Sequence, residues 1–212
     1  RYQRPTTWIP NGVDPIPPQP LSVADVPGLK SRKYLLFLGR LVPEKGLLRL
    51  IEAHHASGIS MPLVITGGDT YAEAHGRALR DMGGAGVIFT GPRHGAARDA
   101  LYTHARAFIL PSHLEGFPLA PLEAMSAGVP ILLSDIPPHH ELLGLGGEGV
   151  CGWIVPDDGW PEALRRVVER APEALREMGD ACRQRVAERY SWDAIADRTL
   201  AVYRGQAGSS VR

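Results

Sequence analysis

Residues 111–128 read PSHLEGFPLAPLEAMSAG and directly follow the apolar run AFIL at 107–110. The run predicts a buried strand, and the stretch after it predicts a helix. Pro121 lacks a backbone N–H and is tolerated only in a first turn, so the helix should start near residues 118–119. Gly128 is expected to cap its end. The strand therefore leads through a glycine-containing turn to a helix N-terminus, where free N–H groups and the helix dipole favour an anion.

The same alternation of strand and helix extends along the whole chain. Apolar segments of strand length also occur at residues 33–38, 63–66, 87–90, 129–133 and 152–155. Helical patterns occur at residues 47–56, 71–82, 97–104, 161–170, 172–190 and 192–203. This order predicts an α/β fold with a doubly wound, Rossmann-like parallel sheet. Because crossovers in such sheets are right-handed, the loops that follow the strands should share one edge.

Composition excludes several classes of protein. The 212 residues include 23 Lys and Arg and 23 Asp and Glu, so a net charge of zero gives no reason to expect nucleic acid or an anionic membrane as a partner. No apolar run approaches the roughly 20 residues of a membrane span, and no signal peptide is visible. Cys151 and Cys182 lie far apart, which predicts a reducing, cytoplasmic compartment and no zinc site. The adjacent His139 and His140 should point to different helix faces, so we expect no metal there either.

The domain organisation is predicted from the two ends of the chain. Residues 1–20 are rich in proline, which excludes helix and central strand and predicts an extended linker between domains. We expect a Rossmann-like domain at 21–190 and a C-terminal helix and tail at 191–212, with Ser191 capping the helix. The chain begins at Arg1, and we expect it to be a piece of a longer protein.

Three predicted strands are followed by residues suited to a nucleotide. Gly39 allows a sharp turn, and Arg40 and Lys45 flank that turn before the next helix, as a diphosphate clamp or as a solvated surface pair. After the next strand, Gly67 and Gly68 provide close backbone approach to a ligand or a plain turn. Arg93 follows the third of these strands, and its planar guanidinium is suited to stacking on an aromatic ring.

Two carboxylates bracket the turn of the central stretch. Glu115 lies in the loop and Glu123 in the second turn of the helix. One interpretation is a pair of glycosidase carboxylates, but both flank an anion site rather than an open sugar cleft. Another is purely structural, with Glu115 capping the loop and Glu123 on the helix surface.

Glu115 and Glu123, with seven residues between them, resemble the Glu-x7-Glu motif of retaining GT-B glycosyltransferases, in the large family usually numbered four. Other segments match that family in order: IPNGVD at 9–14, GRLVPEKG at 39–46, VIFTG at 87–91, GVPI at 128–131 and GWIV at 152–155. Each motif alone is weak, but their order and spacing together are specific. The resemblance covers nearly the whole chain and only the C-terminal, donor-binding half of such an enzyme.

The resemblance implies retaining transfer of a sugar from a nucleoside-diphosphate sugar to an acceptor hydroxyl, with no metal or other cofactor. It assigns catalytic roles to Arg40, Lys45 and Glu115. It assigns substrate binding to Gly39, Gly67, Gly68, Arg93, Gly116, Phe117, Pro118, Leu119 and Glu123, with Glu123 on the ribose. It also implies a missing N-terminal, acceptor-binding domain, through which any contact with a membrane would be made.

Two other functions stay open from the sequence. A nucleotide-sugar epimerase can have the same two-domain architecture, and the isolated chain can be a binding module that holds the donor without transferring it. A nicotinamide-dependent oxidoreductase is disfavoured, because the glycine-rich residues 144–149 do not form the Gly-x-Gly-x-x-Gly fingerprint between a strand and a helix. The base, the sugar and the acceptor are not predicted.

Overall fold

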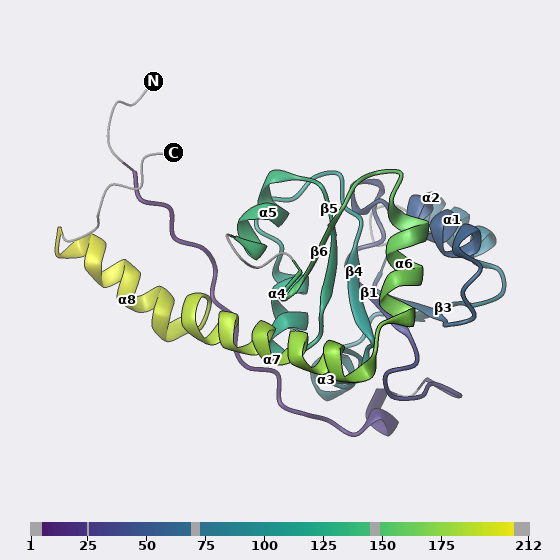
Figure 1. Cartoon of the computed structure of the whole chain (residues 1–212). Coiled ribbons are helices and arrows are strands. Elements are labelled where there is room, and N and C mark those ends of the chain that lie inside the picture. The colour runs from purple at the N-terminus through teal and green to yellow at the C-terminus, as the bar shows by residue number, and fades with distance from the viewer. Residues whose placement is uncertain (1–5, 25, 69–72, 145–148, 206–212) are drawn as a thin grey trace.

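The computed structural model describes residues 6–24, 26–68, 73–144 and 149–205, which form a sheet between two layers of helices (Figure 1). Six parallel strands make up the sheet in the described part of the chain, in the order β3-β2-β1-β4-β5-β6. Their bounds are β1 Leu35–Leu38, β2 Leu63–Thr66, β3 Val87–Gly91, β4 Ala107–Leu110, β5 Ile131–Ser134 and β6 Gly152–Val155. The predicted doubly wound parallel sheet is confirmed.

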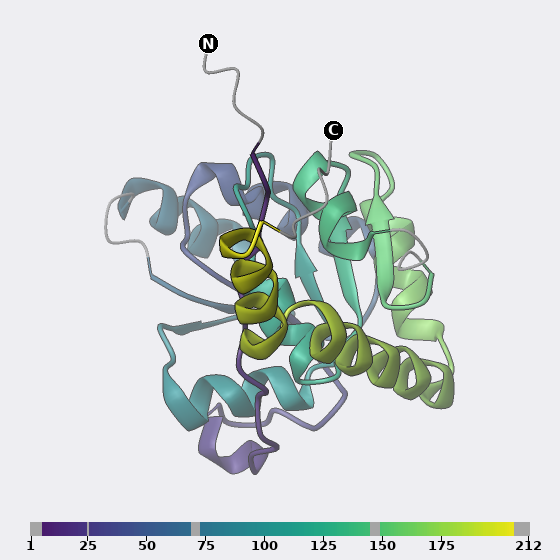
Figure 2. The same ribbon diagram turned by 90° about the vertical axis from the view of Figure 1, so that its left-hand side faces the viewer.

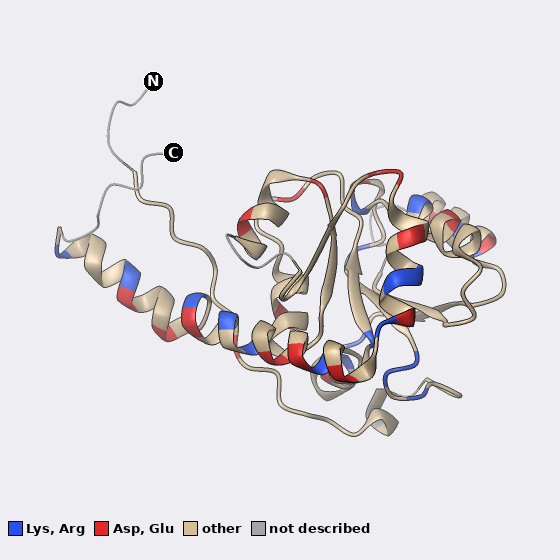
Figure 3. Ribbon diagram, viewed as in Figure 1, with Lys and Arg blue, Asp and Glu red and all other residues tan. Residues whose placement is uncertain are grey.

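Helices cover both faces of this sheet. They are α1 Leu47–Ser57, α2 Glu73–Gly83, α3 Gly95–His104, α4 Leu119–Ser126, α5 Pro137–Leu143, α6 Trp160–Glu169, α7 Pro172–Arg189 and α8 Trp192–Tyr203, with 3-10 turns η1 Leu21–Ala24 and η2 Pro43–Lys45. On one face α1 packs against α2 and α6, and on the other α4 packs against α3 and α7 (Figure 1). Both basic residues (Lys or Arg) and acidic residues (Asp or Glu) lie along α7 and α8 (Figure 3).

The sheet forms the core because its strands are apolar on both sides. Every residue of β2, β4 and β5 is buried, whereas the edge strand β3 is only half-buried. The large side chains Phe37, Phe108 and Trp160 are fully buried. Burial on both faces is what a parallel sheet covered by helices requires.

The strand order reverses between β1 and β4, and this position decides where a ligand can bind. From β1 the chain moves outward through β2 to β3, and it then returns to β4 on the other side of β1. In open α/β sheets a crevice lies outside the carboxyl ends of the strands at such a switch point. The loops at residues 39–46 and 111–118 leave β1 and β4 there, so the central stretch of the sequence lies at the expected ligand position.

The helix boundaries of the central stretch agree with the prediction. Helix α4 starts at Leu119 with Pro121 in its first turn. Its last residue is Ser126, and Gly128 follows with a left-handed φ of 74° while its N–H bonds to Met125 O at 2.9 Å. Ser191 caps α8 as predicted, since its hydroxyl accepts from the Ala194 N–H. The capping chemistry of the sequence was therefore a reliable guide to where these helices begin and end.

Three other boundaries were predicted wrongly by two residues. Strand β1 starts at Leu35 and not at 33, because the Lys33 N–H bonds back to Lys30 O at 3.1 Å in a turn. Strand β5 starts at 131 and not at 129, because the Val129 N–H still bonds to the end of α4. Helix α3 starts at Gly95 and not at 97, since a left-handed φ of 53° lets the chain turn directly into the helix. The predicted start of the helix at 71 lies outside the described residues.

The first described residues and the last helix lie side by side (Figures 1 and 2). Val13 pairs with Ser191 in an isolated parallel bridge, and its N–H donates to Tyr190 O at 2.8 Å. Gly12 lies so close to Trp192 that a Cβ would meet the indole ring at 2.6 Å. Helix α8 then extends away from the sheet with only Ile195 of its residues buried. The extended segment is therefore fixed to the fold at the start of α8.

Candidate functional site

The loops after β1, β2 and β3 touch one another at the sheet edge. The Gly39 N–H donates to Thr66 O at 3.0 Å, and the Gly67 N–H donates to Gly91 O at 3.2 Å. A Cβ on Gly67 would lie 1.8 Å from Gly39 O, and the φ of Gly67 is +154°. The Leu41 N–H completes the contact by donating to Gly68 O at 2.9 Å. Gly67 is thus required for the loops to meet, whatever ligand they hold.

The loops after β1 and β4 meet in the same way. Gly46 has a φ of +66°, and a Cβ there would lie 2.1 Å from Pro111 O. The His113 N–H donates to Glu44 O at 2.8 Å, so the two loops are also joined by a backbone hydrogen bond. This close approach brings Lys45 and Glu115, two predicted site residues that are 70 residues apart, into direct contact.

Lys45 and Glu115 form an ion pair at the switch point. Lys45 Nζ lies 2.6 Å from Glu115 Oε1, and the side chains are 18% and 9% exposed. The same oxygen accepts the Ser112 hydroxyl at 2.6 Å. The pairing was not predicted, because the two residues were assigned separate roles. The ion pair holds the ammonium group of Lys45 at the switch point of the sheet.

A buried histidine stands behind this pair. His139 is fully buried, and its Nδ1 lies 2.8 Å from the carbonyl oxygen of Ser134, so Nδ1 is the protonated nitrogen. The Ser134 hydroxyl donates to Ser112 O, which connects the end of β5 to the Glu115 loop. Burial lowers the pKa of His139, against the opposing effects of the Ser134 carbonyl and the Glu115 charge. The histidine is therefore a neutral support of the loop.

The N-terminus of α4 lies open beside the ion pair. Pro118 precedes the helix and no side chain caps it, so the first N–H groups of α4 have no capping partner from the N-cap residue. Gly116 and Leu119 are exposed, and Phe117 packs on Trp8 and Tyr190 with ring centroids 5.8 and 5.9 Å apart. The positive end of the helix dipole and the ammonium group of the loop thus favour an anion at one position.

The two predicted arginines lie at different depths. Arg40 is exposed, and its guanidinium makes no hydrogen bond or ion pair within the described part of the chain. Arg93 is half-buried, and its Nη1 donates to the neighbouring Pro92 O at 3.3 Å. Arg93 does not line the pocket that lies beside Glu123, so the structure does not bring Arg93 and Glu123 together in that pocket.

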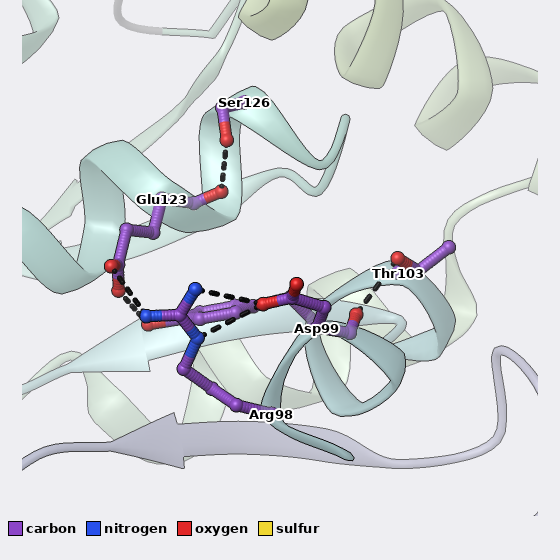
Figure 4. A network of polar contacts seen from close by, with 6 residues as sticks. Arg98, Asp99, Thr103, Glu123 and Ser126 are labelled. Carbon is purple, nitrogen blue, oxygen red and sulfur yellow. Dashed lines mark hydrogen bonds and ion pairs between the residues drawn. The ribbon is translucent and has the colours of Figure 1, made fainter. Parts of the chain in front are cut away.

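Glu123 lies on α4 in a network with three residues of α3 (Figure 4). Its Oε1 accepts from Arg98 Nη1 at 3.1 Å, and its Oε2 accepts from the Tyr102 hydroxyl at 2.9 Å. Asp99 holds Arg98 from the other side, with Oδ1 at 3.0 Å from Nε and 2.8 Å from Nη2. The Glu123 side chain is 23% exposed, and both of its carboxylate oxygens are held by hydrogen bonds from α3.

A pocket of about 320 Å³ opens beside this network. It is lined by Arg98, Asp99, Leu119, Glu123, Trp192 and residues 12–17. Sequence reasoning missed Arg98 and Tyr102, although their spacing of four places them on one helix face, a signal that could have indicated them.

Comparison with known proteins shows the family of this chain. Residues 24–201 match the family model described as glycosyl transferases group 1. The chain belongs to that family. It is 31% identical over 183 residues to an uncharacterised glycosyltransferase of Methanocaldococcus jannaschii, covering 81% of this chain and 45% of the relative. It is 29% identical over 219 residues to the alpha-maltose-1-phosphate synthase of Mycolicibacterium smegmatis, covering 94% of this chain and 54% of that enzyme. The chain thus spans about half the length of the curated relatives it matches.

Solved structures of GT-B glycosyltransferases share the fold of this family member. The Anabaena HepE structure in complex with UDP aligns with a TM-score of 0.77 at 17% identity, over 93% of this chain and 57% of HepE. Sucrose-phosphate synthase of Thermosynechococcus elongatus aligns with a TM-score of 0.76 at 23% identity, over 93% of this chain and 51% of the synthase. Among the described residues, no helix is both long and apolar enough to cross a membrane.

Proposed function

We propose that this chain is the donor-binding domain of a retaining glycosyltransferase of family four, which transfers a sugar from a nucleoside-diphosphate sugar to an acceptor hydroxyl. The observation that carries the proposal is the contact between Lys45 and Glu115 beside the uncapped N-terminus of α4. A cation, a helix dipole and a carboxylate converge where the strand order reverses.

Each part of this site has a role in the proposed reaction. As the glycosidic bond breaks, negative charge grows on the diphosphate oxygens, and Lys45, Arg40 and the backbone N–H groups of Phe117, Leu119 and Ala120 stabilise that charge. Glu115 lies beside the sugar ring, where it accepts hydroxyl hydrogen bonds and faces the positive charge of the oxocarbenium-like transition state. Since this charge stabilisation comes from protein groups, the proposal includes no metal.

The nucleoside occupies the other end of the site. Glu123 accepts the ribose hydroxyls in the pocket beside α3, and Gly39, Gly67 and Gly68 keep the loop backbones close to the diphosphate. Arg93 contacts the base. An N-terminal domain that binds the acceptor completes the enzyme, consistent with relatives about twice as long as the chain. We place the enzyme in the cytoplasm, with residues 1–20 as the linker and residues 191–212 returning to the other domain.

Calorimetric titration of the chain with UDP, GDP and ADP, each compared with its nucleoside, tests the proposal. Lys45→Met and Arg40→Met should each weaken diphosphate binding by about 1.5–3 kcal/mol, the scale of a hydrogen bond to a charged group, and leave nucleoside binding nearly unchanged. Arg176→Met is the matched control, because Arg176 pairs with Glu173 on the surface of α7. Equal losses for diphosphate and nucleoside would refute the clamp.

The two glutamates are separated by a second titration. Glu115→Gln should spare the free nucleotide and weaken the sugar-bearing donor, whereas Glu123→Gln should weaken both through the ribose. Product analysis, with the chain alone and joined to its N-terminal domain, then distinguishes transfer from epimerisation or simple binding. Transfer should be slow without the acceptor domain, because positioning the acceptor supplies roughly 7–11 kcal/mol of the barrier.

A further inference from the structure

Both oxygens of the Glu123 carboxylate are held by one face of α3. Arg98 and Tyr102 are four residues apart, so they lie one helical turn from each other and reach α4 together. Each donates to a different oxygen, at 3.1 and 2.9 Å. Asp99 fixes the guanidinium from behind through Nε and Nη2 (Figure 4). Rotation of the carboxylate would break at least one of these bonds.

Arg98 and Tyr102 both stay protonated, so both donate to Glu123 and its carboxylate acts only as an acceptor. Tyr102 is fully buried, and burial together with the Glu123 charge raises the pKa of its hydroxyl, which therefore stays protonated and donates. Burial acts to lower the pKa of Arg98, but the hydrogen bond to Asp99 and the charges of Asp99 and Glu123 outweigh it and raise the pKa. A carboxylate offers about four lone-pair sites, so about two stay available to a ligand.

A ligand can reach the remaining lone pairs of Glu123 from the pocket beside this network. Arg98 and Glu123 are 32% and 23% exposed, and both line the pocket of about 320 Å³ together with Leu119 and Trp192. Tyr102 does not line the pocket, so it holds the Glu123 carboxylate without itself contacting a ligand there. A ligand in the pocket therefore meets a carboxylate whose direction has been set before binding.

We propose that Arg98 and Tyr102 are positioning residues that fix Glu123 for the two ribose hydroxyls and so determine the preference of the site for a ribonucleotide. The inference rests on the proposed function, since it refines the role of Glu123 in it. A buried polar site that is organised to bond a hydroxyl rejects the analogue without it, because its own groups are then left unpaired. The consequence is discrimination against deoxyribose that depends on α3.

The test compares the affinity of the chain for UDP and 2′-deoxy-UDP, or for GDP and 2′-deoxy-GDP if UDP does not bind. The wild-type chain should prefer the ribonucleotide by about tenfold, the scale of one hydrogen bond to a charged group. Arg98→Met and Tyr102→Phe should reduce this ratio to about twofold on the same scale, and Arg98→Lys should restore part of it. Arg176→Met, on the distant surface of α7, should leave the ratio unchanged.

The ratio separates positioning from folding. A variant that merely destabilises the chain weakens both nucleotides equally, so only a change in the ratio supports the inference. If Arg98→Met fails to fold, Tyr102→Phe still tests the positioning role, because this substitution removes only the hydroxyl oxygen. An unchanged ratio in both variants would overturn the positioning role and leave the proposed function standing. No preference in the wild-type chain, or no binding of either diphosphate, would overturn the ribose assignment and the inference together.

Discussion

Substitution of Gly46 by alanine should separate the two loops that form the site. Gly46 ends η2 and precedes α1 with φ 66° and ψ 23°, a left-handed conformation that costs an L-residue about 1–2 kcal/mol. The added Cβ would lie 2.1 Å from Pro111 O, and contacts under 3.0 Å are essentially never seen for real Cβ atoms. The loop after β1 must therefore move away from the loop after β4.

The size of the effect follows from the bonds across these loops. The hydrogen bonds from the His113 N–H to Glu44 O and from Arg49 Nη2 to Pro111 O, both 2.8 Å, are weakened when the loops separate. With about 0.5–1.5 kcal/mol for each bond added to the strain, Gly46→Ala should lower the free energy of unfolding by about 2–5 kcal/mol. At about 2–4 °C per kcal/mol, Tm should fall by about 4–20 °C.

Gly58→Ala is the matched control. Gly58 has a nearly identical φ of +67° after α1, but its Cβ position has no neighbour within 4 Å. It should therefore show the backbone strain alone, about 1–2 kcal/mol. Urea denaturation followed by circular dichroism measures both variants, and titration with UDP should show weaker diphosphate binding only for Gly46→Ala. Equal destabilisation by the two substitutions would refute the close contact between the loops.

Two further predictions concern buried side chains. The pKa of His139 is lowered below 6.5 in the folded chain, so between that lowered pKa and pH 6.5 the unfolded chain binds a proton that the folded chain does not. The free energy of unfolding should then be fully retained above pH 6.5 and fall as the pH drops, and it should fall less steeply in His139→Asn; parallel curves in urea denaturation would contradict this. Arg106 is buried, and it donates to Val167 O, Val168 O and Arg170 O at the end of α6 at 3.0, 2.7 and 2.6 Å. Arg106→Met should cost about 2–4 kcal/mol in thermal unfolding, and a loss below about 1 kcal/mol would show that these bonds do not hold the helix end.

The sequence by itself determined the six strands and the class of the fold, and it predicted every α-helix of the described residues except α5. Apolar runs fixed the strands because both faces of a parallel sheet exclude water. Pro121 and Gly128 fixed the ends of α4 because a missing N–H and a left-handed φ are properties of single residues. The alternation of strand and helix predicted a doubly wound sheet. In such a sheet ligands bind at the carboxyl ends of the strands, so the pattern also predicted the edge of the site.

Only the tertiary structure decided which side chains meet at that edge. Lys45 and Glu115 are 70 residues apart, and their ion pair exists because β1 and β4 are neighbours and Gly46 allows close approach. Glu123 meets Arg98 and Tyr102 only because α3 and α4 pack on the same face of the sheet. Local patterns report the conformation of each segment, whereas contacts between loops depend on strand order and helix packing, which no short stretch of the chain encodes.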